Sequence, residues 1–129
     1  GTDYTRENVL VKGEVVTEFV LPPQPRGTRG TYRKVRARGS WDFALTGAAV
    51  VVTVAGGSVE RARIVLSGVA PAPWRVQEAE RAIVGKRITA RTARSAAAAA
   101  VKGAQPLSEN GYKVQLLRGT VEEALLSLA

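Results

Sequence analysis

Hydrophobic and polar residues alternate with a period of two through much of the first half of the chain, which predicts β-strands. The predicted strands cover residues 14–21 (EVVTEFVL), a basic segment from residue 31, residues 43–54 (FALTGAAVVVTV) and residues 59–67 (VERARIVLS). Residues 43–54 are apolar on both faces, so we expect other elements to cover that strand on both sides. Residues 55–57 (AGG) indicate a hairpin turn between the last two strands. The pattern therefore predicts a meander of about four strands.

The hydrophobic period becomes helical after a proline-rich connection at residues 68–74 (GVAPAPW). Apolar positions between residues 76 and 85 predict a short helix. Thr89 can cap a second helix that includes the alanine run 96–100, and Ser108 can cap a third that continues to the C-terminus. A run of strands followed by a run of helices is typical of the α+β class. We expect an antiparallel sheet of about four strands with about three helices packed on one of its faces.

The chain has 129 residues, enough for one domain with a hydrophobic core, and it contains neither cysteine nor histidine. These absences exclude disulfides, thiolate or imidazole metal sites, iron–sulfur ligation and Cys- or His-dependent nucleophilic catalysis within this chain. The acid pairs Glu78/Glu80 and Glu122/Glu123 are expected on helix surfaces without partners, which argues against catalysis by them. The sequence contains no long apolar segment and no secretory signal, and we expect a cytoplasmic protein.

The net charge of +8 is concentrated in one stretch of the chain. Between Phe19 and Trp41 there is no acid, and the cations there are Arg26, Arg29, Arg33, Lys34, Arg36 and Arg38. In an extended strand, alternate side chains share one face. The face shared in this stretch would carry Tyr32, Lys34, Arg36 and Arg38. Asp42, which follows the row, is expected to pair with it or to bond turn amides, a structural role.

Three interpretations of this basic stretch remain open. It could be an edge strand whose cations deter aggregation. It could bind nucleic acid through residues 26–38, with Tyr32 and Trp41 as stacking platforms for bases. It could also form one wall of a site for an anionic cofactor whose other walls lie elsewhere. No GxGxxG or Walker A motif is present, so a complete dinucleotide site is not visible.

Three motifs in order then carry a resemblance to a known family. They are YRKVRARGSWDFAL at residues 32–45, ARIVLSGVAPAPWRVQEAE at residues 62–80 and AQPLSENGYKVQLLRGTVEEAL at residues 104–125. Together they resemble the C-terminal domain of the FAD-binding (medium) subunit of molybdenum hydroxylases, the family of xanthine dehydrogenase and aerobic carbon monoxide dehydrogenase. The resemblance implies that residues 14–129 form this domain and that residues 1–13 lead in from a preceding domain.

The resemblance implies a role toward FAD for three residues of the basic stretch. By position, Lys34 matches a lysine that approaches the flavin ring, Arg38 matches an arginine that supports the same site, and Tyr32 lies beside them. A cation near the ring would stabilise the reduced, negatively charged flavin and raise its potential. The family's glycine-rich FAD segments lie in two N-terminal domains and are absent here. The chain is therefore expected to be a fragment or a separately encoded domain that binds FAD weakly or not at all when alone.

The resemblance also implies partners. In this family a molybdenum subunit oxidises the substrate, and iron–sulfur clusters in a second subunit pass electrons to FAD and on to an acceptor. The expected partners are the molybdenum-cofactor subunit, the iron–sulfur subunit and the N-terminal FAD-binding domains of the same subunit. The chain would be part of an oxidoreductase complex and not catalytic as an isolated domain. A pure subunit-docking module, with the C-terminal helices at the interface, is compatible with this role.

Overall fold

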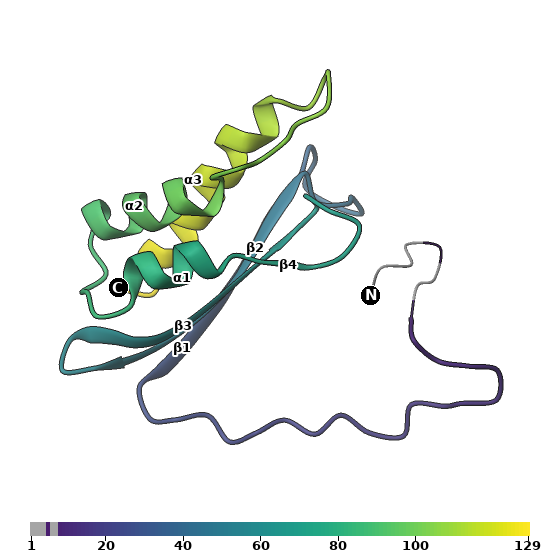
Figure 1. The fold of residues 1–129 in the computed structure, drawn as a ribbon, viewed down its shortest axis with the longest axis horizontal. Coiled ribbons are helices and arrows are strands. Elements are labelled where there is room, and N and C mark those ends of the chain that lie inside the picture. Colours follow the sequence, from purple (N-terminus) through teal and green to yellow (C-terminus); the bar gives the residue numbers. More distant parts are fainter. Residues whose placement is uncertain (1–4, 6–7) are drawn as a thin grey trace.

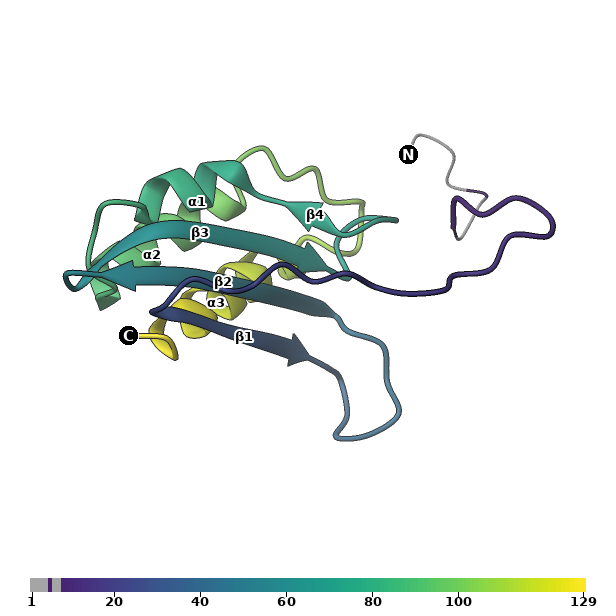
Figure 2. The ribbon, with the colours of Figure 1, turned by 90° about the horizontal axis from the view of Figure 1, so that it is seen from below.

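The computed structural model describes residue 5 and residues 8–129, which form one antiparallel sheet and three helices. In chain order the elements are β1 (Thr28–Val35), β2 (Thr46–Ala55), β3 (Ser58–Ser67), β4 (Trp74–Arg75), α1 (Gln77–Ile83), α2 (Ala90–Ala100) and α3 (Tyr112–Leu126). The strands lie in the sheet in the same order as in the chain. Figures 1 and 2 show all three helices on one side of the sheet. The predicted α+β class, with helices on one face, is confirmed.

The predicted strand at residues 14–21 is wrong. Residues 8–27 form neither strand nor helix, and Phe19 is 85% exposed. In Figure 1 this segment runs well apart from the sheet. Its alternating pattern meets no strand edge, and Pro22, Pro23 and Pro25 supply no N–H with which a ladder could continue into β1. The fourth strand of the sheet is instead the two-residue β4, which pairs with the end of β3. The expected lead-in at residues 1–13 lies partly outside the described residues.

The core lies between the sheet and the helices. Side chains at every second position of β2 and β3 point to the helices and are buried: Thr46, Ala48, Val50, Val52, Ala62, Ile64 and Leu66. The alanine run of α2 supplies Ala96, Ala97 and Ala100 to the same core. Small side chains there let the helices approach one another closely, as expected of a structural alanine run. The predicted hairpin turn is confirmed at Gly56-Gly57, where both residues have positive φ.

Of the two predicted helix caps, one is confirmed and one is wrong. Thr89 caps α2 as predicted: its Oγ1 accepts a hydrogen bond from Thr92 N at 3.2 Å, and Thr89 N donates to Thr92 Oγ1 at 2.9 Å. The predicted cap at Ser108 is wrong, because α3 begins at Tyr112. The side chain of Asn110 accepts a hydrogen bond from Leu107 N at 2.7 Å, which holds these residues in a turn. The turn delays the start of α3 by about one helical turn.

Candidate functional site

The face of the sheet opposite the helices carries the candidate site. β2 was predicted to be covered on both sides, and this is wrong: Val51, on the open face, is 40% exposed. The apolar pattern reflects small residues on this face, since Gly47 and Ala49 lie between the neighbouring strands. Residues without long side chains can be apolar without building a second core. The sheet therefore has one core face and one open face.

Tyr32 lies across this open face and is held there by a hydrogen bond. Its hydroxyl and Ser67 Oγ are 3.1 Å apart, although the two residues belong to β1 and β3, the strands on either side of β2. Gly47 of β2 makes the contact possible, because a Cβ there would lie 3.0 Å from the Tyr32 hydroxyl oxygen and would collide with Ser67 Oγ. The result is a flat patch in which an aromatic ring lies beside small residues.

Lys34 shares the open face with Tyr32, two residues further along β1 and opposite Gly47. Within the described residues, the Lys34 ammonium has no hydrogen bond or ion pair with a protein group. Arg33 points the other way, as the alternation predicted, and its Nη2 lies 2.6 Å from Glu123 Oε2 on α3. Arg29 also reaches α3's end, donating to Leu128 O at 3.1 Å. The basic stretch is thus divided between two faces and does not form the continuous cationic surface that nucleic acid would require.

The predicted row of four side chains is shorter than expected. β1 ends at Val35, so Arg36 and Arg38 lie in the loop formed by residues 36–45. Arg38 Nη2 donates to Trp41 O at 3.3 Å, and Arg38 Nε lies 3.9 Å from Asp42 Oδ2. Asp42 therefore has the structural role that was predicted for it. Of the three predicted cofactor-binding residues, Tyr32 and Lys34 come together on the open face, while Arg38 lies in the loop that follows them.

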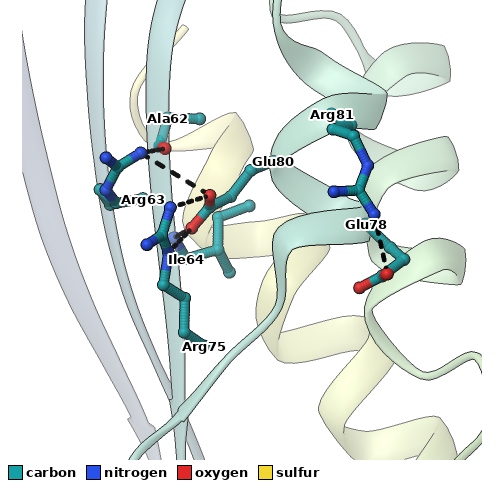
Figure 3. A network of polar contacts seen from close by, with 7 residues as sticks. All are labelled: Ala62, Arg63, Ile64, Arg75, Glu78, Glu80 and Arg81. Carbon is teal, nitrogen blue, oxygen red and sulfur yellow. Dashed lines mark hydrogen bonds and ion pairs between the residues drawn. The ribbon is translucent and has the colours of Figure 1, made fainter.

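An ion-pair network centred on the buried Glu80 lies where β3, β4 and α1 meet (Figure 3). The carboxylate of Glu80, whose side chain is 8% exposed, accepts hydrogen bonds from Arg75 Nε at 2.8 Å and Arg75 Nη2 at 2.7 Å. It also accepts one from Ile64 N at 3.1 Å, and Arg63 Nη1 lies 3.8 Å away. These bonds join the short β4 and the middle of α1 to β3.

The network lowers the pKa of Glu80. The largest cause is the hydrogen bond from Arg75, followed by an opposing effect of burial, then by the Ile64 N–H and the charges of Arg75 and Arg63. Glu80 was expected on the helix surface without a partner, which is wrong. The signal that marks it is its place on the inner stripe of α1, because positions 76, 79, 80 and 83 follow helical spacing and are all buried. Its oxygens are occupied by protein donors, so its role is structural.

The described residues offer neither a metal-ligand cluster nor a membrane-spanning helix. No group of three or more acidic, cysteine or histidine side chains there could hold a metal ion. No helix in residues 8–129 has the length and apolarity needed to cross a bilayer.

A two-layer α+β domain with three helices on one sheet face, and a tyrosine and a lysine on the open one, defines the structural class. The chain belongs to the family of CO dehydrogenase flavoprotein C-terminal domains, whose model matches residues 30–128. The recognition made from the three motifs is thereby confirmed. No comparison supports nucleic-acid binding.

Relatives and solved structures agree with this assignment. The chain is 33% identical over 119 residues to the aldehyde oxidoreductase FAD-binding subunit PaoB of Escherichia coli, covering 92% of this chain and 34% of that protein. It is 31% identical over 125 residues to the carbon monoxide dehydrogenase medium chain of Hydrogenophaga pseudoflava, covering 94% of this chain and 43% of that one.

Among solved structures, carbon monoxide dehydrogenase from Hydrogenophaga pseudoflava superimposes with a TM-score of 0.75 at 34% identity, over 82% of this chain and 38% of that one. Quinoline 2-oxidoreductase from Pseudomonas putida 86 gives 0.73 at 28% identity, over 81% and 38%. The chain thus spans between about a third and somewhat less than half of the length of these proteins.

Proposed function

We propose that this chain serves as the C-terminal domain of the FAD-binding subunit of a molybdenum hydroxylase. The observation that carries the proposal is the family match over residues 30–128. The proposed partners are a molybdenum-cofactor subunit, an iron–sulfur subunit and the N-terminal FAD-binding domains of the same subunit. FAD, when bound, supplies the redox chemistry that carries electrons from iron–sulfur clusters to an acceptor. The domain's part is to position the cofactor, and chemistry by the isolated chain is not proposed.

The open face fits the ring end of a flavin and not its phosphate end. Tyr32, Gly47 and Ala49 form a flat patch, which suits a planar aromatic ring. Gly56-Gly57 is used up by the β2–β3 hairpin, and the described residues contain no other glycine-rich phosphate loop. The proposed site is therefore one wall, with Tyr32, Lys34 and Arg38 as the residues that would face the cofactor, and the ADP portion would be bound by other domains.

Each proposed residue has a distinct task. The hydroxyl contact with Ser67 fixes the position of the Tyr32 ring. Lys34 keeps an ammonium free of protein partners in the described residues, so it can balance negative charge on the ring at little cost. Arg38 is tied to Trp41 O and Asp42, and its guanidinium would support the edge of the site from the loop.

The first test replaces Lys34 in the full-length flavoprotein with alanine. We expect flavin content, measured by visible absorbance per mole of protein, to fall and the midpoint potential to drop by on the order of 30 mV, which is about 1.4 kcal/mol for a two-electron couple. Lys34→Arg should restore most of both values. Arg61→Ala is the matched control, because Arg61 is a cation on β3 near the far end of the same face. An unchanged content and potential in Lys34→Ala would rule out this role for Lys34.

A second measurement addresses the assembly. The native complex, purified through a tag on the full-length flavoprotein, should contain flavin, iron and molybdenum in fixed ratios. A homogeneous preparation lacking iron and molybdenum would contradict the proposed partners while leaving the flavin assignment untouched.

A further inference from the structure

Three loops gather at one end of the molecule. They are residues 36–45 between β1 and β2, residues 68–73 between β3 and β4, and residues 101–111 between α2 and α3. Both Figure 1 and Figure 2 show them at the end away from the β2–β3 hairpin and from the C-terminus. We call this region, together with Trp74 and the first residues of α3, the loop end.

The loop end concentrates exposed apolar side chains. Outside residues 8–27, ten large apolar side chains of the described residues are exposed. Six of them lie at the loop end: Trp41, Phe43, Val69, Trp74, Leu107 and Tyr112. Trp41 is 95% exposed and Phe43 is 92% exposed, values that a folded domain rarely gives to two neighbouring aromatic residues. Packing within the domain therefore does not account for the presence of Trp41 and Phe43 at these positions.

One hydrogen bond and one close backbone approach link α3, the β3–β4 loop and the β1–β2 loop, so this part of the surface is formed in advance. Lys113 Nζ donates to Gly68 O at 2.8 Å, which ties α3 to the β3–β4 loop. Gly68, with φ of +70°, lies so close to the β1–β2 loop that a Cβ would come within 2.8 Å of Ala44 O. Trp41 is the one non-glycine residue of the described chain with positive φ, and Arg38 holds its carbonyl at 3.3 Å. A surface ordered before binding loses less entropy when a partner docks.

A cleft beside these residues could receive side chains of a partner. It has a volume of about 560 Å³ and lies between the end of β3, the C-terminus of α2 and the start of α3. Leu66, Trp74, Val101 and Leu117 contribute apolar walls, and Lys113 lies at the same cleft. Its size suits one or two apolar side chains inserted by another chain.

Charge indicates the chemistry of the partner. Apart from the Arg38–Asp42 pair, three cations, Arg36, Lys102 and Lys113, and one acid, Glu109, lie around the exposed aromatics. We propose that the loop end is a docking surface for a protein partner whose contact patch is apolar at the centre and acidic at the rim. Exposed Trp, Tyr and Arg beside an apolar-walled cleft are the composition of interface hot spots, whereas a nucleic-acid surface would need more cations and fewer aliphatic residues. The inference goes beyond the proposed function, because it requires no flavin and places docking at the loops, not at the helix faces.

The main test uses the full-length flavoprotein co-purified with its complex. The double variant Trp41→Ser/Leu107→Ser should weaken assembly by about tenfold or more, measured as the dissociation constant of the complex by mass photometry over a dilution series. The matched control is Val84→Ser/Leu126→Ser, which removes two exposed apolar side chains outside the loop end and should leave assembly unchanged. Thermal melts of both variants check that folding is retained.

A charge variant keeps the test independent of apolar packing. Lys102→Glu should slow association and remove most of its dependence on salt, whereas Arg91→Glu, at the other end of α2, should do neither. Unchanged assembly in both loop-end variants would overturn the docking surface. So would an effect confined to self-association, to duplex DNA or to anionic vesicles. FAD content is measured in parallel, because its loss without a change in assembly counts against the proposed function and not against this surface.

Discussion

The two faces of the sheet are made of the same strands and have opposite chemistry. On the helix side, Val50, Val52 and Ile64 are fully buried. On the other side, Tyr32 and Lys34 stand over small residues, and Val51 is exposed. Because neighbouring side chains in a strand point to opposite faces, one stretch of sequence provides both the stability of the domain and its candidate binding surface. Substitutions one residue apart should therefore have quite different effects.

The largest expected effect is on the core face. Ile64→Ala should lower the free energy of unfolding by about 2–5 kcal/mol, since it removes three buried carbons and leaves a cavity. Val51→Ala, on the open face, should change it by about 0.5 kcal/mol. Urea denaturation followed by circular dichroism measures both. Similar losses for the two variants would mean that the open face is covered and that the comparison fails.

Glu80→Gln comes next, because it removes the buried charge of the ion-pair network at the sheet edge. We expect a loss of about 1–3 kcal/mol, as Ile64 N–H and Arg75 lose a charged acceptor. The matched control is Glu78→Gln, two residues earlier on the same helix, which breaks the exposed Glu78–Arg81 pair of 2.8 Å and should cost less than about 0.5 kcal/mol. Figure 3 shows the two glutamates from the same helix.

The network also makes stability depend on pH in a predictable direction. The pKa of Glu80 is lowered in the folded state, chiefly by the Arg75 hydrogen bond. Its stabilising effect is therefore complete above the pKa of a free glutamate, about 4.3, and is lost as the pH falls through the lower folded value. Urea titrations at decreasing pH should show this loss in the parent chain and a shallower dependence in Glu80→Gln. An identical slope in both would exclude Glu80 as the source.

A smaller effect is expected at Gly47, where the open face is most crowded. Gly47→Ala should destabilise by about 1 kcal/mol, because its Cβ displaces Ser67 and Tyr32. Adding Ser67→Ala should recover part of that loss by removing the colliding hydroxyl, a positive coupling in a double-mutant cycle. In the full-length flavoprotein, Gly47→Ala should also reduce flavin content. Additive losses would show that the crowding is relieved elsewhere.

The smallest effect belongs to the exposed pair between β1 and α3. Arg33→Ala should cost about 0.2–1 kcal/mol and should lose most of that effect in high salt, since both side chains of the 2.6 Å Arg33–Glu123 pair are more than half exposed. Flavin content should not change, because Arg33 points away from the open face. A loss of flavin as large as in Lys34→Ala would contradict the division of the basic stretch between two faces.

Local patterns predicted those parts of the fold that local physics decides. The Gly56-Gly57 hairpin, the alternation of β3 and the Thr89 cap each depend on residues within a few positions of one another. The failures depend on distant partners. The alternating residues 14–21 lack a strand edge, and the two-residue β4 forms only because β3 offers one. Ser108 does not cap a helix, because the side chain of Asn110 holds residues 107–110 in a turn.

The candidate site divides in the same way. The alternation of β1 predicted that Tyr32 and Lys34 share a face, whereas nothing local indicates that the strand ends before Arg36. The contact of Tyr32 with Ser67 across Gly47 joins three strands, and sequence spacing alone does not reveal it. The structural role of Glu80 was not predicted, because an acid on an apolar helix stripe can be interpreted only when its partners, Arg75 and the Ile64 N–H, are known. That flavin faces these residues stays a prediction.

The order of the strands has a consequence for how the domain assembles. Every strand pairs with its neighbour in the chain, and β2 and β3 are joined by a two-residue turn. Each pairing therefore closes a short loop, which costs little chain entropy. Strand pairings between segments that are close in sequence form faster than pairings between distant segments. The strands can pair one hairpin at a time as the chain is synthesised. The sheet on which the helices pack can therefore form before α3 is made.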